Sequence, residues 1–266
     1  MIITHAGLQG KRPTMEDNEI IELNGKGTNK NKRNVNLFAV FDGHGGSEIS
    51  KYLKKNLGQY FMNPKTKYPL NKTYCVDVCN KLQNEIKTLP NEVGFLSGST
   101  ALIGVIFQKN NNKYLNIINI GDCRSVLCRN NIAVPLTVDH KPNYPIEKRR
   151  IENLGGVIKK DLYDWRIGNL SVSRAFGDLD TAPYVTPEPD LYRYKLVKSD
   201  KFLIFGCDGL WDCLTNQQVC NFILNNFYNE TLDKLIYKKK DIAQKVAQYA
   251  IASGSTDNVS VIIIFF

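Results

Sequence analysis

Three aspartates stand at the ends of apolar runs in widely separated parts of the chain, each beside a glycine or an asparagine: Asp42, Asp208 and Asp257. The apolar run 38–41 leads directly into Asp42, and the run 202–205 precedes Asp208 by two residues. Glycine beside a carboxylate lets the backbone approach a ligand closely, and oxygen-rich sites suit magnesium or manganese. A single Asp-Gly pair is typical of a turn. The repeated arrangement predicts a metal centre.

The glycine-rich segment Asp42–Gly46 precedes an expected helix, an arrangement also found in nucleotide-binding loops. The segment matches neither G-x-G-x-x-G nor the G-K-[ST] ending of a P-loop. The nucleotide-binding interpretation is therefore set aside.

The elements that must position these carboxylates are mostly strands. Alternating or continuous apolar runs predict strands at Ile2–Leu8, Asn18–Leu23, Val35–Phe41, Ser99–Phe107, Lys113–Ile120, Arg124–Arg129, Lys201–Gly206 and Val259–Phe265. Asn130 and Asn131 precede a further apolar stretch, Ile132–Leu136. Because asparagine tolerates positive φ, this pair predicts a tight hairpin.

Apolar residues at three- and four-residue steps predict helices at 47–61, 74–89 and 242–251. Thr215 and Gln218 have the spacing of a capping box, which predicts a helix from there to about Phe227. Helices do not alternate strictly with strands, and short turns join successive strands, which favours antiparallel sheets and the α+β class. With no long linker or repeat, residues 1–266 are expected to form one domain.

Composition limits the compartment and the class. The chain has 266 residues, 42% of them hydrophobic, so it can bury a substantial core. Its seven cysteines are an odd number without a C-x-x-C pair, which favours a reducing compartment and gives no support to a zinc site. Because no stretch approaches the roughly 20 apolar residues of a membrane span, we expect a cytoplasmic or nuclear protein that is neither secreted nor inserted in a membrane.

The formal net charge is +9, from 35 basic and 26 acidic residues. Basic residues concentrate in short polar segments such as Lys26–Arg33 and Lys238–Lys240, which are typical of solvated loops and helix faces. We therefore expect no nucleic-acid partner.

Eight segments together carry a resemblance that covers the whole chain. They are Arg12–Asp17, Phe41–Gly46, Ser97–Ala101, Gly121–Arg124, Asp139–Pro142, Leu170–Asp178, Cys207–Asp212 and Ser255–Ser260. In this order and at these distances, the chain resembles the PP2C (PPM) family of metal-dependent protein serine/threonine phosphatases. The resemblance implies two antiparallel β-sheets packed as a central sandwich and flanked by helices on both sides. It also implies that the substrates are phosphorylated proteins and that the chain is a monomer.

The resemblance further implies two Mg²⁺ or Mn²⁺ ions, with Asp42 at the position that bridges them. Asp208 and Asp257 would complete the shell of one ion, while Glu16 and the backbone carbonyl of Gly43 would hold the other. A metal-activated water would attack phosphorus, so no covalent phosphoenzyme is required.

Other matched residues receive supporting roles from the same resemblance. Arg12 would grip the substrate phosphate, for which a planar guanidinium suits better than an ammonium, and His44 would act as general acid for the leaving alkoxide. Asp122 and Asp212 match positions that hold a weaker third metal in some members. Asp17 and Thr100 would support the metal ligands from behind. Asp178 ends a matched segment without an assigned role.

The family's variable flap, which should influence substrate choice, corresponds to residues 142–168. Arg166–Leu170 departs here from the more usual Arg-Val-Asn-Gly-x-Leu pattern, so the flap's conformation does not follow from the resemblance.

Two alternatives are weighed against the phosphatase interpretation. A catalytically inactive binding module of the same fold would usually lack one or more metal carboxylates, and this chain retains all of them. A cysteine-dependent phosphatase is suggested by the C-x5-R spacing of Cys123 and Arg129, but the intervening residues contain no glycine and are typical of a packed strand.

Overall fold

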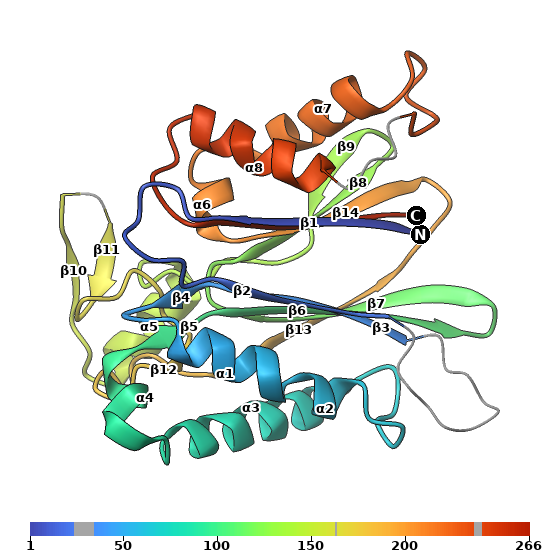
Figure 1. Ribbon diagram of the computed structural model, residues 1–266. Coiled ribbons are helices and arrows are strands. Elements are labelled where there is room, and N and C mark those ends of the chain that lie inside the picture. The colour runs from blue at the N-terminus through green and yellow to red at the C-terminus, as the bar shows by residue number, and fades with distance from the viewer. Residues whose placement is uncertain (24–34, 163, 237–240) are drawn as a thin grey trace.

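Two five-stranded sheets lie face to face in the computed structural model (Figure 1). The structure describes residues 1–23, 35–162, 164–236 and 241–266. One sheet has the order β1 (Ile2–Leu8), β15 (Val259–Phe265), β14 (Asp200–Gly206), β8 (Arg124–Arg129) and β9 (Ile132–Pro135). The other has the order β13 (Asp190–Lys195), β7 (Asn112–Ile120), β6 (Ala101–Lys109), β3 (Val35–Phe41) and β2 (Asn18–Glu22). All neighbours within these sheets pair antiparallel.

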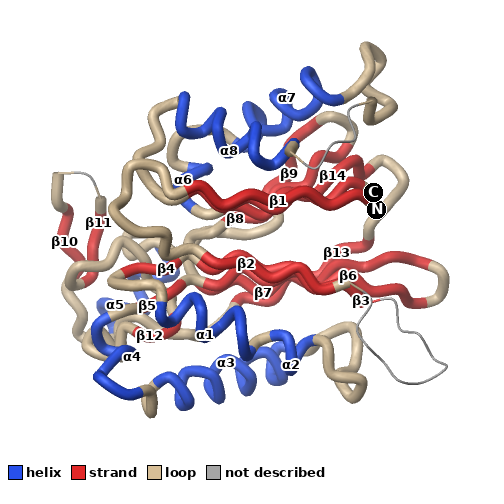
Figure 2. The backbone as a smooth tube through the Cα atoms, viewed as in Figure 1, coloured by secondary structure: helices blue, strands red, loops and turns tan. Residues whose placement is uncertain are grey.

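Helices cover the outer face of each sheet (Figure 2). The β2–β13 sheet packs against α1 (Glu48–Asn56), α2 (Gly58–Phe61), α3 (Lys72–Ile86) and α4 (Val93–Leu96). The β1–β9 sheet packs against α6 (Asp208–Trp211), α7 (Asn216–Phe227) and α8 (Ile242–Ala252). The predicted α+β class, with a central sandwich flanked by helices on both sides, is confirmed.

The central strands are apolar throughout because both of their faces are buried. In β3, Leu37, Ala39 and Phe41 pack against the helices, whereas Phe38 and Val40 point between the sheets. Strand β14 alternates in the same way. This double burial fixes the register of β3 and β14, and with it the positions of the residues that follow them.

Local sequence signals are confirmed at several element ends. Thr215 and Gln218 form the predicted capping box at the start of α7. Asn130 and Asn131 have φ of 51° and 66°, as expected for the hairpin between β8 and β9. Asn110 and Asn111, with φ of 49° and 60°, form a second such turn between β6 and β7 that the sequence analysis did not identify.

Two predicted elements are divided in the structure. The helix expected at 47–61 is interrupted at Leu57, so that α1 ends at Asn56 and α2 begins at Gly58. The strand expected at Ser99–Phe107 is broken at Thr100, because Thr100 N–H bonds to the Asp42 carbonyl. The residues before it form β5 (Gly98–Ser99), which joins β4 (Gly43–His44) and β12 (Phe176–Gly177) in a small sheet.

The flap contains helix α5 (Pro145–Asn153) and the hairpin of β10 (Ile158–Lys160) and β11 (Trp165–Ile167). The 3-10 turn η1 (Pro90–Glu92) lies outside the flap and directly precedes α4. A small apolar cluster holds the flap together, centred on Ile151 and Ile167. The flap is also tied to the body by an ion pair between Glu147 and Arg174, at 2.5 Å.

None of the helices among the described residues has the length and apolar character needed to cross a bilayer. The basic segments Lys26–Arg33 and Lys238–Lys240 lie outside the described residues.

Candidate metal centre and active site

The predicted site residues converge on one cavity of about 380 Å³ at the ends of β3 and β14. Its lining includes Arg12, Glu16, Asp42, Gly43, His44, Thr100, Asp122, Asp208, Asp212 and Asp257. Asp17 does not line the cavity but is buried, and burial raises the pKa of its carboxyl to about 6. The structure thus brings together residues that are up to 245 positions apart in the chain.

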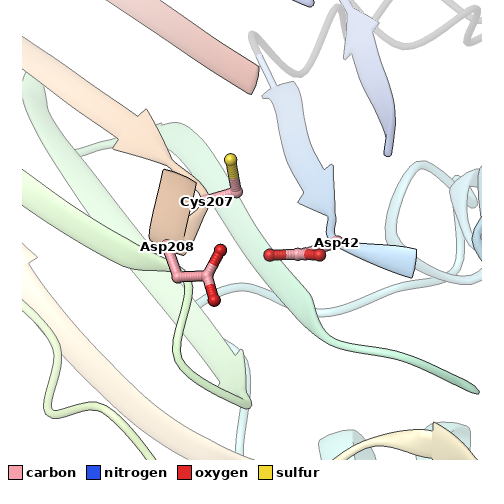
Figure 3. Close-up of side chains that lie close together, drawn as sticks. All are labelled: Asp42, Cys207 and Asp208. Atoms are coloured by element: carbon pink, nitrogen blue, oxygen red, sulfur yellow. The ribbon is translucent and has the colours of Figure 1, made fainter. Parts of the chain in front are cut away.

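Asp42 and Asp208 both line this cavity, and their carboxylates face one another (Figure 3). One ligand atom each from Asp42, Asp208 and Cys207 lie within 4.8 Å of one another. Burial raises the pKa of both carboxyl groups well above the ordinary range, and repulsion adds to it, from Asp208 in the case of Asp42 and from Asp122 in the case of Asp208. Two half-buried carboxylates held this close together are stabilised in their charged forms by a bound cation.

The surrounding donors fit a hard divalent cation. They are carboxylate oxygens together with the Gly43 carbonyl, the donor type that magnesium and manganese prefer. Asp122 Oδ1 is buried without a hydrogen-bond partner among the described residues, as expected of an atom that coordinates an ion. The site therefore suits the ions that the resemblance implies.

Thr100 holds the backbone at Asp42. Its N–H donates to the Asp42 carbonyl at 2.9 Å, and its hydroxyl accepts from the Asp42 N–H at 3.2 Å. The same hydroxyl contacts Cys123 Sγ at 3.2 Å. These bonds fix the position of the Asp42 backbone at the end of β3.

Glycine at position 43 is required by the close approach of the Glu16 loop. A Cβ on Gly43 would lie 2.4 Å from the Glu16 carbonyl oxygen. That oxygen accepts from the Ser50 hydroxyl at 2.5 Å, which attaches the loop to α1. The backbone at Glu16 is thereby held directly against Gly43.

Asn258 is a positioning residue that the sequence analysis did not single out, although it lies in a matched segment. Its side-chain oxygen accepts from Glu16 N–H at 2.8 Å, and its amide donates to the carbonyls of Gln9 and Thr14. A Cβ on Gly209 would lie 2.0 Å from the Asn258 carbonyl oxygen, so α6 begins directly against this turn. Asn258 therefore joins the Glu16 loop to the strand that follows Asp257.

Arg12 forms an ion pair with Asp257, with Nη2 and Oδ2 2.5 Å apart. The Arg12 side chain is 58% exposed at the mouth of the cavity. An exposed guanidinium can change partners at low cost, because a surface ion pair contributes little to stability. Arg12 is therefore free to turn toward an anion in the cavity.

His44 is oriented by Asp178, the residue to which the sequence analysis gave no role. His44 Nε2 lies 2.9 and 2.8 Å from the two Asp178 carboxylate oxygens. Burial acts to lower the pKa of His44, but the Asp178 carboxylate outweighs it and the pKa is raised. The position of Asp178 at the end of the matched segment Leu170–Asp178 was the available signal.

Asp122 and Asp212 lie on the Asp208 side of the cavity. Asp212 is the residue that caps the C-terminal end of α6, and its N–H donates to the Asp208 carbonyl at 2.8 Å. Asp122 pairs with Lys141, a residue outside the sequence-based prediction. Burial acts to lower the pKa of Lys141, but Asp122 and Asp208 outweigh it and raise the pKa. A cation of the protein itself thus stands beside the carboxylates.

The cysteine-dependent alternative does not fit the geometry. Cys123 is fully buried, and burial raises the pKa of its thiol well above the ordinary value. A nucleophilic cysteine needs a lowered pKa and access to substrate. Arg129 instead pairs with Asp200 at 2.6 Å, at the far end of β8.

Known proteins resemble this chain in both sequence and fold. The family model for protein phosphatase 2C matches residues 3–259. A PP2C-like domain-containing protein of Acanthamoeba polyphaga mimivirus is 50% identical over 168 residues, which cover 57% of this chain and 94% of that protein. The rice (Oryza sativa subsp. japonica) probable protein phosphatase 2C 7 is 32% identical over 98% of this chain, which spans 65% of the rice protein.

Two solved structures resemble this one across 99% of its length. A C. elegans sex determining protein has a TM-score of 0.85 and 26% identity, with 64% of that chain covered. A Toxoplasma gondii phosphatase has a TM-score of 0.82 and 25% identity, with 92% covered. Both the match of the family model and the rice relative cover nearly the whole chain. The chain therefore belongs to the protein phosphatase 2C family.

Proposed function

We propose that this protein is a metal-dependent phosphatase that hydrolyses phosphoserine and phosphothreonine in other proteins. The observation that carries the proposal is the convergence of Glu16, Asp42, Asp208 and Asp257 on one cavity, with Arg12 at its mouth. The phosphatases among the relatives and solved structures support the same conclusion.

Asp42 and Asp208, with Asp257, Glu16 and the Gly43 carbonyl, would hold two magnesium or manganese ions. When bound, the ions supply Lewis-acid polarisation of the phosphoryl group and a water of lowered pKa. Thr100 and Asn258 keep the ligand-bearing backbone in place, so that little reorganisation is needed when substrate arrives.

Arg12 would exchange Asp257 for the phosphoryl oxygens and grip them bidentately. His44 would protonate the leaving alkoxide of serine or threonine. Because Nε2 faces Asp178, Nδ1 is the ring nitrogen that remains to donate the proton. The Asp178 carboxylate favours the protonated imidazole and holds the ring in place.

The test is release of phosphate from a phosphothreonine peptide by purified protein, with manganese or magnesium and with excess chelator. We expect metal-dependent release that collapses in Asp42→Asn and persists in Asp77→Asn, an exposed aspartate on α3. Circular dichroism of each variant would check folding. No release by the folded wild-type protein with either metal would contradict the proposal.

The second candidate, a binding module without turnover, is favoured only by that negative result.

We also propose that residues 1–266 form one domain and act as a monomer, which size-exclusion chromatography with light scattering would test. A third ion held by Asp122 and Asp212 would have to displace or accommodate Lys141.

A further inference from the structure

A second hollow adjoins the catalytic cavity and has a different character. This groove, of about 700 Å³, lies between α4 and the flap, and His44, Asn169 and Leu170 line both spaces. Figure 1 places α4, α5 and β4 at the same end of the molecule, on the left of the view. A substrate with its phosphate beside His44 would therefore extend into this groove.

The walls of the groove expose apolar side chains from two elements. Phe95 and Leu96 at the end of α4 are 48% and 70% exposed, and Val157 opposite them on the flap is 64% exposed. Leu96 lies close to the catalytic histidine, since a Cβ on Gly45 would be 2.4 Å from the Leu96 carbonyl oxygen. An exposed apolar surface continuous with an active site is typical of a recognition surface.

The lining of the groove includes two acidic residues. Asp178 and Asp180 line it, and none of its described lining residues is a lysine or an arginine. The Asp178 carboxylate already faces His44, whereas that of Asp180 is exposed and accepts only a local bond from the Thr181 hydroxyl at 3.1 Å. The groove thus disfavours acidic residues and favours an apolar side chain accompanied by a positive charge.

We propose that this groove binds the segment of a phosphoprotein substrate that flanks the phosphorylated residue, and that it selects a large aliphatic side chain there. The inference rests on the proposed function and adds the class of substrate to it. An extended chain advances about 3.3 Å per residue, so a side chain a few positions from the phosphate reaches Leu96.

The experiment compares phosphothreonine peptides with an alanine background, in which leucine is placed in turn at each of three positions on either side. At one of these positions we expect kcat/KM to exceed that of the all-alanine peptide by about fivefold to tenfold, the effect of filling an open apolar subsite. In Leu96→Ser the ratio of kcat/KM for the leucine peptide to kcat/KM for the all-alanine peptide should fall to about 1 to 2. Because both peptides are assayed with one preparation, the ratio is insensitive to any general loss of activity.

Ile146→Ser is the matched control. Ile146 is 76% exposed on α5 and does not line the groove, so the selectivity ratio should stay at the wild-type value. Replacing the neighbouring alanine by lysine should raise kcat/KM in the wild type and not in Asp180→Asn. Equal rates for all leucine positions and alanine, or an unchanged ratio in Leu96→Ser, would overturn the proposal.

Hydrolysis of p-nitrophenyl phosphate separates this inference from the proposed function, because that substrate does not enter the groove. If the wild-type protein hydrolyses neither substrate, the proposed function fails. Fluorescence anisotropy of the labelled peptides in the presence of manganese then measures binding directly. Tighter binding of the leucine peptide that Leu96→Ser abolishes would still support the groove, and equal binding would overturn it.

Discussion

Glu147 provides a quantitative test of how the flap is attached to the sandwich. Its side chain is 3% exposed and accepts from Arg174 at 2.5 Å and from Arg150 at 3.0 Å. Burial acts to raise the pKa of Glu147, but the two guanidinium groups outweigh it and lower the pKa from 4.5 to about 2. At about 1.4 kcal/mol per pKa unit, the difference corresponds to about 3 kcal/mol of stability at neutral pH.

Glu147→Gln removes this charge and leaves the buried Arg174 without its main counter-ion. We expect the free energy of unfolding to fall by about 3 kcal/mol at pH 7. Because the folded-state pKa is lowered, the contribution is complete above the unfolded pKa of 4.5 and is lost as the pH falls through about 2. The difference from wild type should therefore shrink to about half at pH 3.

Glu152→Gln is the matched control on the same helix. Its carboxylate is 53% exposed and lies 3.7 Å from Lys148, so we expect a change within about 0.5 kcal/mol. Urea unfolding at both pH values gives the global stability, and hydrogen exchange of α5 detects a loss confined to the flap. Equal behaviour of the two variants at pH 7 by both methods would refute the reasoning.

Three further outcomes follow from the site. Asp178→Asn should lower kcat for a phosphothreonine peptide by about tenfold to hundredfold, and for p-nitrophenyl phosphate by less, because that leaving group needs no proton; equal losses would argue against His44 as the acid. Gly43→Ala should lower activity at least about tenfold and reduce Tm, since the added carbon would lie 2.4 Å from the Glu16 carbonyl oxygen; unchanged activity and Tm would show that the loop yields. Saturating manganese should raise Tm by about 5 °C or more and chelator should reverse this, because the ions relieve repulsion between Asp42 and Asp208; a Tm independent of metal would count against the site.

Strongly patterned elements were predictable from the sequence. Strands β1, β3, β8 and β15 have the predicted bounds, because alternating or continuous apolar patterns of ordinary strand length allow few other structures. The exposed strand β13 and the flap helix α5 were missed, since their residues are largely polar on the solvent side and give a weak periodic signal. Tertiary contacts, rather than local propensity, stabilise them.

The candidate site shows the same division. The carboxylates could be named from motifs because magnesium and manganese prefer oxygen ligands, and Asp42 and Asp208 stand beside glycine just after apolar strands. The partners of those residues were harder to assign: Asp178, Lys141 and Asn258 act through contacts between segments that no local pattern reveals. The roles of the metal ligands themselves remain predictions until an ion is measured in the cavity.

The position of β15 has a consequence for the timing of activity during synthesis. This strand lies between β1 and β14, and the turn just before it supplies Asp257 and Asn258 to a cavity whose other wall includes Arg12, 245 residues earlier. A growing chain on the ribosome could hold β3 and β14, but it could hold neither β1, which pairs with β15 at the edge of its sheet, nor the cavity, because the contacts of highest sequence separation form late. Phosphate hydrolysis should therefore begin only after β15 has emerged, which keeps a nascent chain from acting on nearby phosphoproteins.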